Sequence, residues 1–527
     1  MTMPMKGRMV RAGVALAMAA APVPRAAAQE PGCQEVATVG DRCPDWIATY
    51  DGGAGGAAFM SVDVPAAVAV APGGGPVFVT GRGNANQTGS DIVTVAYDPA
   101  TGAERWVASH AGPGKADDRA TDVAVSSDGS SVFVAGVENR SNARNVRSVT
   151  IAYDAATGAI RWLSTQSGVA SYEDTVRVGV SPDAERVYVA TRERASEGTT
   201  GLVVRALDAA TGSEVWSGRH PAADKVLKPS LAVSPDGRRV FVGATEGYDS
   251  EQGADYLVTA FGADEAGQAG ELLWTARYDG PYTNDLLHAM AMAPDGSAVY
   301  ATGESEGPWR NDAATVAFGA EDGATLWVSR FETVGWDAGH AVAVSPDGSR
   351  VYVAGVADDQ DQMLLSAFLI SSQDALVVAY DAATGEQDWF DLAGVPGFLD
   401  ERAVAVGVSA GGTVHAAGYS AATFNGQQGP SGGGGGSFDS KGNSYSHSFN
   451  TGNATVVTLA YSPEGEREWV ARQAAPPGGN TAYAVALAHP GDGSDVFVAA
   501  ARFQPYADSE HQETSNLADF LTLGFRS

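Results

Sequence analysis

Short apolar runs rich in valine recur along almost the whole chain, separated by turns rich in glycine, proline and aspartate. One kind of run follows turns such as Ser234-Pro-Asp-Gly237 and Ser345-Pro-Asp-Gly348. Proline at the second and glycine at the fourth turn position favour a type I turn, so each turn predicts a hairpin with the run before it. The run that follows the turn is found eight times: Val77–Gly81, Val132–Gly136, Val187–Thr191, Val240–Ala244, Val299–Gly303, Val351–Gly355, Val414–Gly418 and Val496–Ala500.

A second pattern follows most of these hairpins. A third apolar run, such as Val149–Tyr153, leads through Asp154-Ala-Ala-Thr-Gly158 into a run that contains a tryptophan. Four consecutive antiparallel strands per unit, with Val, Tyr and Phe in the strands and Gly, Pro and Asp in the turns, are typical of a propeller blade. Such tryptophans end seven units: Trp106, Trp162, Trp216, Trp274, Trp327, Trp389 and Trp469.

The two ends of the chain complement each other. The eighth unit, from about Tyr483 to Phe525, has no fourth strand, whereas Pro44–Tyr50 carries Trp46 where a fourth strand should have one. One N-terminal strand that completes the last blade closes the ring and leaves no open sheet edge. We therefore predict an all-β protein, an eight-bladed propeller over residues 44–527, in preference to seven blades with an extra hairpin.

Two insertions lengthen the second-to-third strand connection of a blade, residues 358–374 in the sixth and residues 420–454 in the seventh. The second contains Gly432–Gly436. These glycines have no Gly-Lys-Ser or Gly-Lys-Thr ending and therefore do not predict a phosphate-binding loop. They are typical of a flexible surface loop, which we expect near the mouth of the ring.

The pattern Ala-x-Asp-x-x-Thr-Gly-x-x-x-Trp resembles the tryptophan-docking motif of pyrroloquinoline-quinone (PQQ) type eight-bladed propellers. It is met in full at 96–106, 152–162, 206–216 and 379–389, and the looser resemblance covers nearly all of residues 44–527. The whole unit is similar to exported bacterial propeller-repeat proteins.

The resemblance implies that each tryptophan packs between neighbouring blades. It also raises a PQQ and calcium-dependent dehydrogenase as one function. Quinone enzymes of this fold commonly have adjacent cysteines, many have a Cys-x-x-Cys-His haem site, and both features are absent here.

The N-terminus predicts export. Lys6, Arg8 and Arg11 precede an apolar run, and Ala26–Ala28 offers a cleavage site, so residues 1–28 are expected to be a signal peptide. The expected product is soluble, secreted or periplasmic, and monomeric. Residues 29–43 form a tail with the only cysteines, Cys33 and Cys43, which we expect to form a disulfide in an exported protein. Metal ligation by the pair is the less favoured alternative, because further ligands nearby are few.

The chain is strongly acidic, with 63 Asp and Glu against 33 Lys and Arg and a formal net charge of −30. Loss of residues 1–28 removes basic side chains alone and makes the charge more negative. Such a surface repels phosphate backbones and anionic lipids, which argues against nucleic acid and membrane partners.

Two groups of residues are candidates for chemistry. An acid recurs ten residues before the turn aspartate position, at the entry to the first strand: Asp63, Asp118, Glu173, Asp285, Asp337 and Glu401. We favour loop capping for these acids over a carboxylate ring that attracts cations. The fifth and sixth units alone have a histidine three residues later, His288 and His340. Together with Asp285 and Asp337 these histidines could bind a metal or form an acid–base pair, although polar lining of the inner wall is the interpretation we favour.

Three functions follow. The first is a non-enzymatic exported propeller that binds a protein, a polysaccharide or a small ligand through its loops. The second is a dehydrogenase with PQQ and calcium. The third is a metal-dependent hydrolase or lyase centred on His288 and His340. No catalytic residue, cofactor or specific partner is assigned by the sequence.

Overall fold

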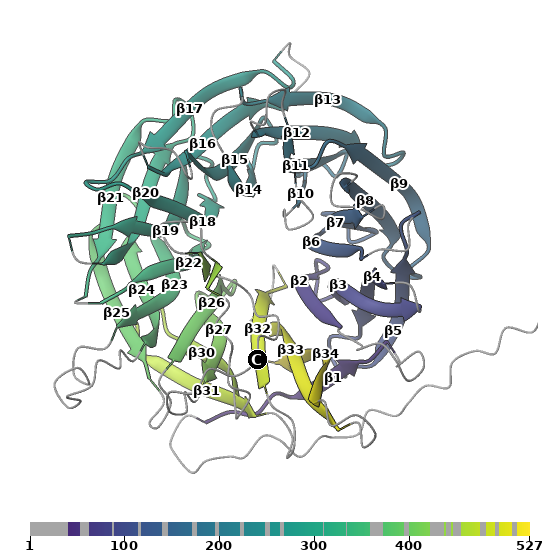
Figure 1. Ribbon diagram of the computed structural model, residues 1–527. Coiled ribbons are helices and arrows are strands. Elements are labelled where there is room, and N and C mark those ends of the chain that lie inside the picture. Colours follow the sequence, from purple (N-terminus) through teal and green to yellow (C-terminus); the bar gives the residue numbers. More distant parts are fainter. Residues whose placement is uncertain are drawn as a thin grey trace, which may run out of the picture.

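The computed structural model shows a ring of β-sheets with the first strand of each sheet innermost (Figure 1). The described part of the chain contains strands and turns and no helix. The structure describes residues 41–52, 63–86, 89–113, 117–139, 146–170, 176–194, 200–221, 226–247, 253–263, 268–308, 310–333, 335–358, 373–394, 400–421, 437–438, 444–445, 455–474, 481–490, 495–507 and 514–526.

Eight antiparallel blades make up the ring, each with its strands numbered from the inside outward, except that β1 is the outermost strand of the last blade. The blades are β2 (Val64–Val70), β3 (Val77–Asn86), β4 (Gly89–Tyr97), β5 (Glu104–His110); β6 (Arg119–Val125), β7 (Ser131–Asn139), β8 (Val146–Asp154), β9 (Ile160–Ser167); β10 (Arg177–Val180), β11 (Arg186–Arg194), β12 (Thr200–Asp208), β13 (Glu214–Arg219); β14 (Leu227–Val233), β15 (Arg239–Glu246), β16 (Asp255–Gly262), β17 (Leu272–Tyr278); β18 (Asp285–Met292), β19 (Ala298–Glu306), β20 (Asn311–Gly319), β21 (Thr325–Phe331); β22 (Ala338–Val344), β23 (Arg350–Asp358), β24 (Gln373–Asp381), β25 (Gln387–Ala393); β26 (Asp400–Val408), β27 (Val414–Ala421), β30 (Thr455–Tyr461), β31 (Arg467–Ala474); and β32 (Thr481–Ala488), β33 (Val496–Ala507), β34 (Thr514–Phe525), β1 (Trp46–Tyr50).

The N-terminal strand closes the ring. Strand β1 pairs antiparallel with β34, in a register that places Trp46 opposite Gly524. The predicted eight blades and their closure by the N-terminal strand are confirmed, and the seven-bladed alternative is excluded. The sixth and seventh blades are joined by one parallel bridge between Gln373 and Asp400, so their strands form a single extended sheet.

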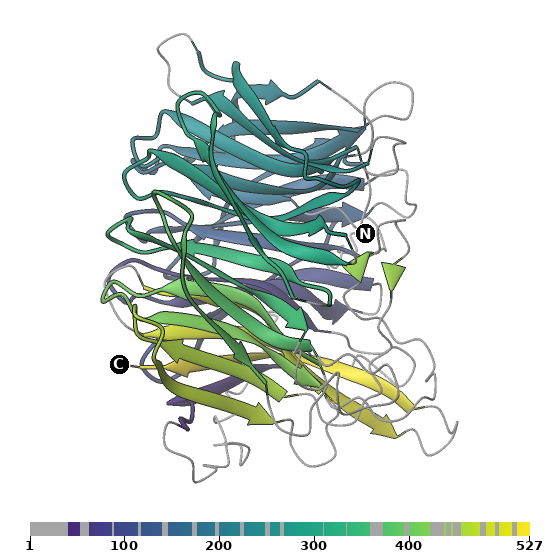
Figure 2. The same cartoon turned by 90° about the vertical axis from the view of Figure 1, so that its left-hand side faces the viewer.

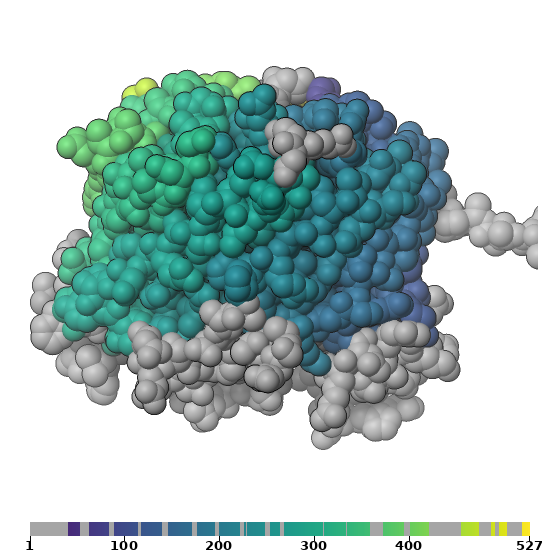
Figure 3. Space-filling view, turned by 90° about the horizontal axis from the view of Figure 1, so that it is seen from above, coloured from purple at the N-terminus to yellow at the C-terminus, as the bar shows by residue number. Residues whose placement is uncertain are grey.

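Burial follows the position of a strand within its blade. The third strands β16 and β20 are buried along almost their whole length, because neighbouring blades cover both faces of each sheet. The fourth strands β17 and β21 form the outer rim and are partly exposed. Figure 3 shows this outer wall over the blue, teal and green blades as a continuous packed surface.

The tryptophans of the motif dock each blade on the next one. Trp162 packs over Gly212, where an added Cβ would lie 2.5 Å from the indole, and its Nε1 donates a hydrogen bond to Ala209 O at 2.8 Å. Gly212 has φ +71°, so glycine serves both the turn and the close approach of the ring. The same hydrogen bond, between 2.8 and 3.2 Å, joins Trp46 to Pro99, Trp106 to Ala155, Trp274 to Ala320, Trp327 to Ala382 and Trp389 to Pro463.

Two tryptophans of the set differ. The Nε1 of Trp216 has no hydrogen-bond partner among the described residues, although the ring still lies beside Gly270. Trp469 docks the seventh blade on the eighth. Its ring stacks on Phe525, with 5.2 Å between the ring centroids, and the Arg42 guanidinium lies 5.1 Å from the Trp469 centroid.

The two faces of the ring are built from different connections (Figure 2). Because strands alternate in direction, the turns after first and third strands lie on one face, which we name the turn face. Second-to-third and fourth-to-first connections lie on the opposite face, the loop face. Both long insertions leave the loop face, between β23 and β24 and between β27 and β30.

Several predicted features lie wholly or partly outside the described residues. Residues 1–28 and Cys33 are among them, so the signal peptide, export and the disulfide with Cys43 stay predictions. Of the 420–454 insertion the structure describes, within the connection, β28 (Ser437–Phe438) and β29 (Ser444–Tyr445), which form a short antiparallel pair. No helix in the described part of the chain is long and apolar enough to cross a membrane.

Candidate functional site

The recurring acids fasten loops to the blades. Asp63, Asp118, Asp285 and Asp337 are buried at the entry to the first strands β2, β6, β18 and β22. Each accepts a hydrogen bond, 2.5 to 2.8 Å long, from a backbone N–H of the preceding connection on the loop face. The donors are Gly52, Gly112, Gly280 and Thr333 respectively.

Two of these carboxylates also reach the end of the second strand of their own blade. Asp118 accepts from the Asn139 N–H at 2.9 Å, and Asp337 accepts from the Asp358 N–H at 3.2 Å. Burial raises the pKa of Asp118 to about 6 and that of Asp337 to about 7. These bonds are the loop-capping arrangement that the sequence favoured. Glu173, the corresponding acid of the third blade, lies outside the described residues.

His288 and His340 lie side by side on the inner strands β18 and β22, with ring centroids 5.6 Å apart. Each imidazole donates a hydrogen bond from Nδ1 to a carbonyl of the following blade. His288 bonds Gly339 O at 3.0 Å and His340 bonds Ala403 O at 3.1 Å. The two histidines therefore link the fifth blade to the sixth and the sixth blade to the seventh.

The protonation state of His340 limits its chemistry. Burial, together with the charges of His288 and Arg402, lowers the pKa of His340 to about 3. A general base works best with a pKa near the operating pH, so His340 is a weak base near neutrality. Asp285 and Asp337 bond their own loops, and among the described residues the groups of acids and histidines placed for a metal contain neither histidine.

The residues around the histidines were not identified from the sequence. Glu304, buried at the end of β19, faces His288 with Oε1 3.6 Å from Nε2. Its Oε2 accepts hydrogen bonds of 2.8 Å from Trp336 Nε1 and from Asn311 Nδ2. Burial acts to raise the pKa of Glu304, but the nearby His288 imidazole and the hydrogen bonds from Asn311 and Trp336 lower it overall. No repeated spacing marks Trp336 or Asn311, which is why sequence reasoning missed this network.

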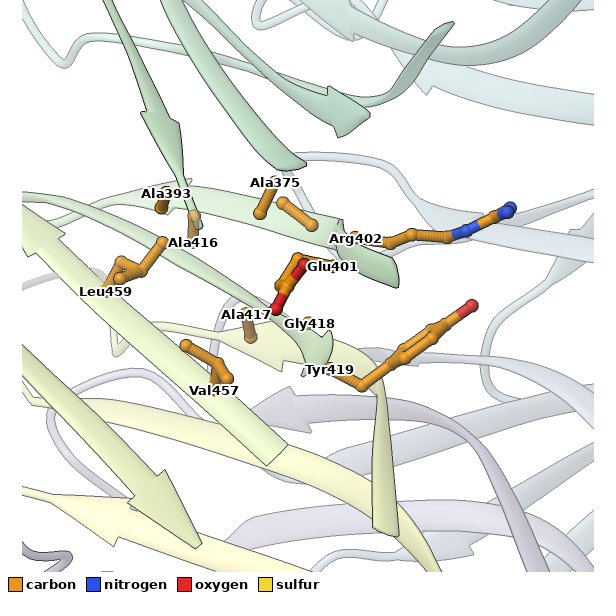
Figure 4. Close-up of a pocket in the computed structure, with 11 residues that line it drawn as sticks. Ala375, Ala393, Glu401, Arg402, Ala416, Ala417, Gly418, Tyr419, Val457 and Leu459 are labelled. Carbon is orange, nitrogen blue, oxygen red and sulfur yellow. The ribbon is translucent and has the colours of Figure 1, made fainter. Parts of the chain in front are cut away.

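A small cavity lies between the sixth and the seventh blade (Figure 4). The Glu401 carboxylate points among small apolar side chains, including Ala375 and Ala417, while Arg402 and Tyr419 extend away from it. The empty space is about 240 Å³ with open solvent included. Apolar walls around one carboxylate give a poor environment for a polar substrate.

Two arginines of the inner strands, Arg177 and Arg402, do not fit a role in binding a quinone cofactor that carries several carboxylates. Such a group requires basic side chains free to face it. The Arg177 guanidinium on β10 donates instead to Pro229 O at 3.2 Å and to Thr121 O at 3.5 Å. Arg402 on β26 donates to Gln373 Oε1 at 2.7 Å and covers the Trp336 ring at 5.4 Å. Both guanidinium groups hold neighbouring strands in place, and we derive no step through a quinone.

Part of the repeat region matches a known family model. Residues 89–258 match the PQQ_2 family model, described as outer membrane protein assembly factor BamB. Over these residues the chain is similar to PQQ-like repeats, and the eight closed four-stranded blades are the fold expected from that similarity. No curated protein matches the chain.

Solved structures similar to this chain have different activities. Sqt1 of Chaetomium thermophilum, solved with the N-terminus of ribosomal protein L10, is 12% identical, covers 89% of this chain and 98% of its own, and has a TM-score of 0.48. Quinohemoprotein alcohol dehydrogenase of Comamonas testosteroni is 13% identical, with coverage of 88% and 75% and a TM-score of 0.40. Periplasmic gluconolactonase of Pseudomonas aeruginosa is 16% identical, with coverage of 63% and 89% and a TM-score of 0.37.

Proposed function

We propose that the protein is an exported binding scaffold that takes a protein partner on its loop face and carries out no catalysis. The observation that carries this proposal is the use made of the polar groups near the inner wall. His288 and His340 bond carbonyl groups of the next blade, and the recurring acids bond loop N–H groups. The groups most suited to chemistry thus hold blades and loops together.

The loop face supports the proposal because both insertions leave from it. Strand β27 is paired with β30 up to Ser420 and Thr455, so the connection between them begins directly at that face. Surface loops positioned by a rigid scaffold are where binding residues concentrate. A large acidic propeller also offers a wide surface, which suits a macromolecular partner more than a small ligand.

The test compares capture of partners by the full chain and by three variants, using exported proteins of the host. In the first variant a short glycine-serine turn replaces 422–454 between β27 and β30. A rim variant carries Ile160→Ser and Phe390→Ser, which lie on β9 and β25 and are 50% and 49% exposed. A turn-face variant carries Glu321→Arg, at a side chain that is 82% exposed.

We expect the loop variant to lose the captured protein while the rim and turn-face variants retain it at wild-type level. Loss in the rim or turn-face variant, with retention in the loop variant, contradicts the choice of face. Binding of a purified polysaccharide in place of any protein contradicts the partner class.

A further inference from the structure

Three carboxylates gather where the fourth blade meets the fifth. Asp255 opens β16, Asp279 follows the last residue of β17, and Asp285 opens β18 of the next blade. One carboxylate oxygen from each lies within 4.8 Å of the other two. The three residues come from the third strand of one blade, the connection after its fourth strand and the first strand of the next.

Backbone contacts hold these segments against each other. Asp285 N–H donates to Ala254 O at 2.5 Å, and Ala254 N–H donates to Thr283 O at 3.1 Å. Gly253 has φ +99°, and a Cβ there would lie 1.6 Å from Thr283 O, so a side chain at this position would force the two segments apart. The carboxylates are therefore kept together by the backbone rather than by attraction between their side chains.

The buried member of the group has an oxygen without a well-formed hydrogen bond. Asp285 is 1% exposed, and its Oδ2 accepts the Gly280 N–H at 2.6 Å. Its Oδ1 is buried and makes no hydrogen bond of good geometry with the described residues, although the Ser305 hydroxyl near the carboxylate partly offsets the rise in pKa that burial causes. A buried carboxylate oxygen without a donor is costly, and a bound cation is one way to satisfy it.

The two arginines near the cluster form their ion pairs with other carboxylates. Arg277 binds Glu246 Oε2 at 2.6 Å, and Arg330 binds Asp312 Oδ2 at 2.6 Å. With Glu246 and Asp312 added to the three aspartates, five carboxylates share two guanidinium groups.

In the fifth blade, the aspartate that corresponds to Asp255 is neutralised by an arginine. Asp312 occupies in β20 the place of Asp255 in β16, five residues before the alanine that pairs with the blade's tryptophan. Arg330 occupies in β21 the place of Arg277 in β17, three residues after that tryptophan. Arg330 reaches its aspartate, whereas the recorded ion pair of Arg277 is with Glu246 on β15.

Aspartates also occupy the positions that correspond to Asp255, Asp279 and Asp285 at a second junction, between the eighth blade and the first. Asp519 lies five residues before the partner of Trp46, Asp51 lies five residues after that tryptophan, and Asp63 precedes β2. One oxygen from each of these aspartates again lies within 4.8 Å of the others. The junctions are four blades apart, on opposite sides of the ring (Figure 1).

We propose that Asp255, Asp279 and Asp285 bind a calcium ion that fastens the fourth blade to the fifth. Oxygen ligands alone favour calcium or magnesium over zinc, which prefers nitrogen and sulfur. Calcium tolerates irregular, carboxylate-rich geometry better than magnesium, which demands a near-ideal octahedron. This site is separate from the His288 and His340 pair and does not depend on the proposed binding function.

The experiment uses the full chain after treatment with EDTA and dialysis. Calcium chloride is titrated by calorimetry, and the melting temperature is measured in EDTA, in calcium and in magnesium. The test variants are Asp279→Asn and Asp255→Asn. The matched control is Glu332→Gln, an exposed acid that has the position of Asp279 in the fifth blade. Asp51→Asn separates binding at the closing junction from binding at this one.

We expect calcium to raise the melting temperature of the wild type, and Asp279→Asn to weaken binding at this site by about tenfold or more, since charge count sets affinity in such sites. In EDTA, Asp279→Asn should be at least as stable as the wild type, because it removes repulsion. In calcium the order should reverse. Glu332→Gln should behave as the wild type in both.

Three results overturn the proposal. One is a wild type that binds no calcium after EDTA treatment. Another is an Asp279→Asn variant with the stoichiometry and affinity of the wild type. The third is an Asp279→Asn variant that loses the same stability in EDTA as in calcium, because that result assigns the aspartate a purely structural role.

Discussion

Gly212→Ala tests how much the tryptophan docking between blades contributes to stability. The turn glycine has φ +71°, where a non-glycine residue costs about 1–2 kcal/mol. An added Cβ would also lie 2.5 Å from the Trp162 ring, and overpacking of this kind costs about 1–3 kcal/mol. The expected loss of unfolding free energy is therefore about 2–5 kcal/mol.

Gly237→Ala is the matched control. Gly237 has the same φ of +71°, but its nearest neighbour would be Pro182 Cδ at 3.4 Å from the new Cβ. This change should cost only the backbone part, about 1–2 kcal/mol. Urea unfolding followed by tryptophan fluorescence gives both values, and the slopes of the two transitions must agree for the comparison to hold.

A double-mutant cycle isolates the contact itself. Trp162→Ala alone should cost about 3–5 kcal/mol, because it removes a large buried side chain. In that background Gly212→Ala should cost no more than Gly237→Ala does, since the clash is gone. The coupling of about 1–3 kcal/mol between the two positions measures the clash of the new Cβ with the Trp162 ring, and so how closely that ring packs on the turn. Equal losses for Gly212→Ala and Gly237→Ala in the wild-type background would refute this reasoning.

Two further predictions follow from the inner wall and the closing strand. Trp46→Phe keeps an aromatic ring but removes the hydrogen bond to Pro99. In urea unfolding it should therefore lower the unfolding free energy by about 1 kcal/mol more than Trp216→Phe, because the indole N–H of Trp216 has no partner in the described structure. Equal losses in the two variants would contradict this prediction. His340 should stay neutral by NMR titration down to about pH 3, with the His340→Gln variant identifying its signal. Because the folded pKa lies below the ordinary value of 6.5, this histidine's contribution to stability should be lost as pH falls from about 6.5 towards 3, and a His340 signal that titrates near pH 6 would contradict the burial argument.

Much of the fold could be predicted because its determinants are local and repeated. The turn before each Val-Phe-Val strand and the motif ending in Trp106 or Trp162 specify hairpins within a few residues of sequence. Closure by Trp46 could be predicted from the strand missing after Phe525. The capping interpretation of the recurring acids also came from sequence, because aspartate at a tight connection commonly accepts backbone N–H groups.

The candidate sites were less accessible from sequence, since they depend on contacts between blades. In the fourth and fifth blades, an arginine three residues after the tryptophan can form an ion pair with an aspartate on the third strand. A competing carboxylate on the second strand decides whether this ion pair forms. Glu246 takes Arg277, whereas Asp312 keeps Arg330. The gathering of Asp255 with Asp279 and Asp285 likewise requires the register of three strands at once. Only Asp285 stood out in the sequence, through its place in the series of recurring acids.

Hydrogen–deuterium exchange with a captured partner bound tests most directly where this propeller binds. Peptides from the fourth-to-first and second-to-third strand connections should gain protection, because these connections form the loop face. Turns such as 234–237 and 154–158, on the turn face, should exchange at the same rate with and without the partner. Protection concentrated in those turns, with the loop-face peptides unchanged, would contradict the proposed binding surface.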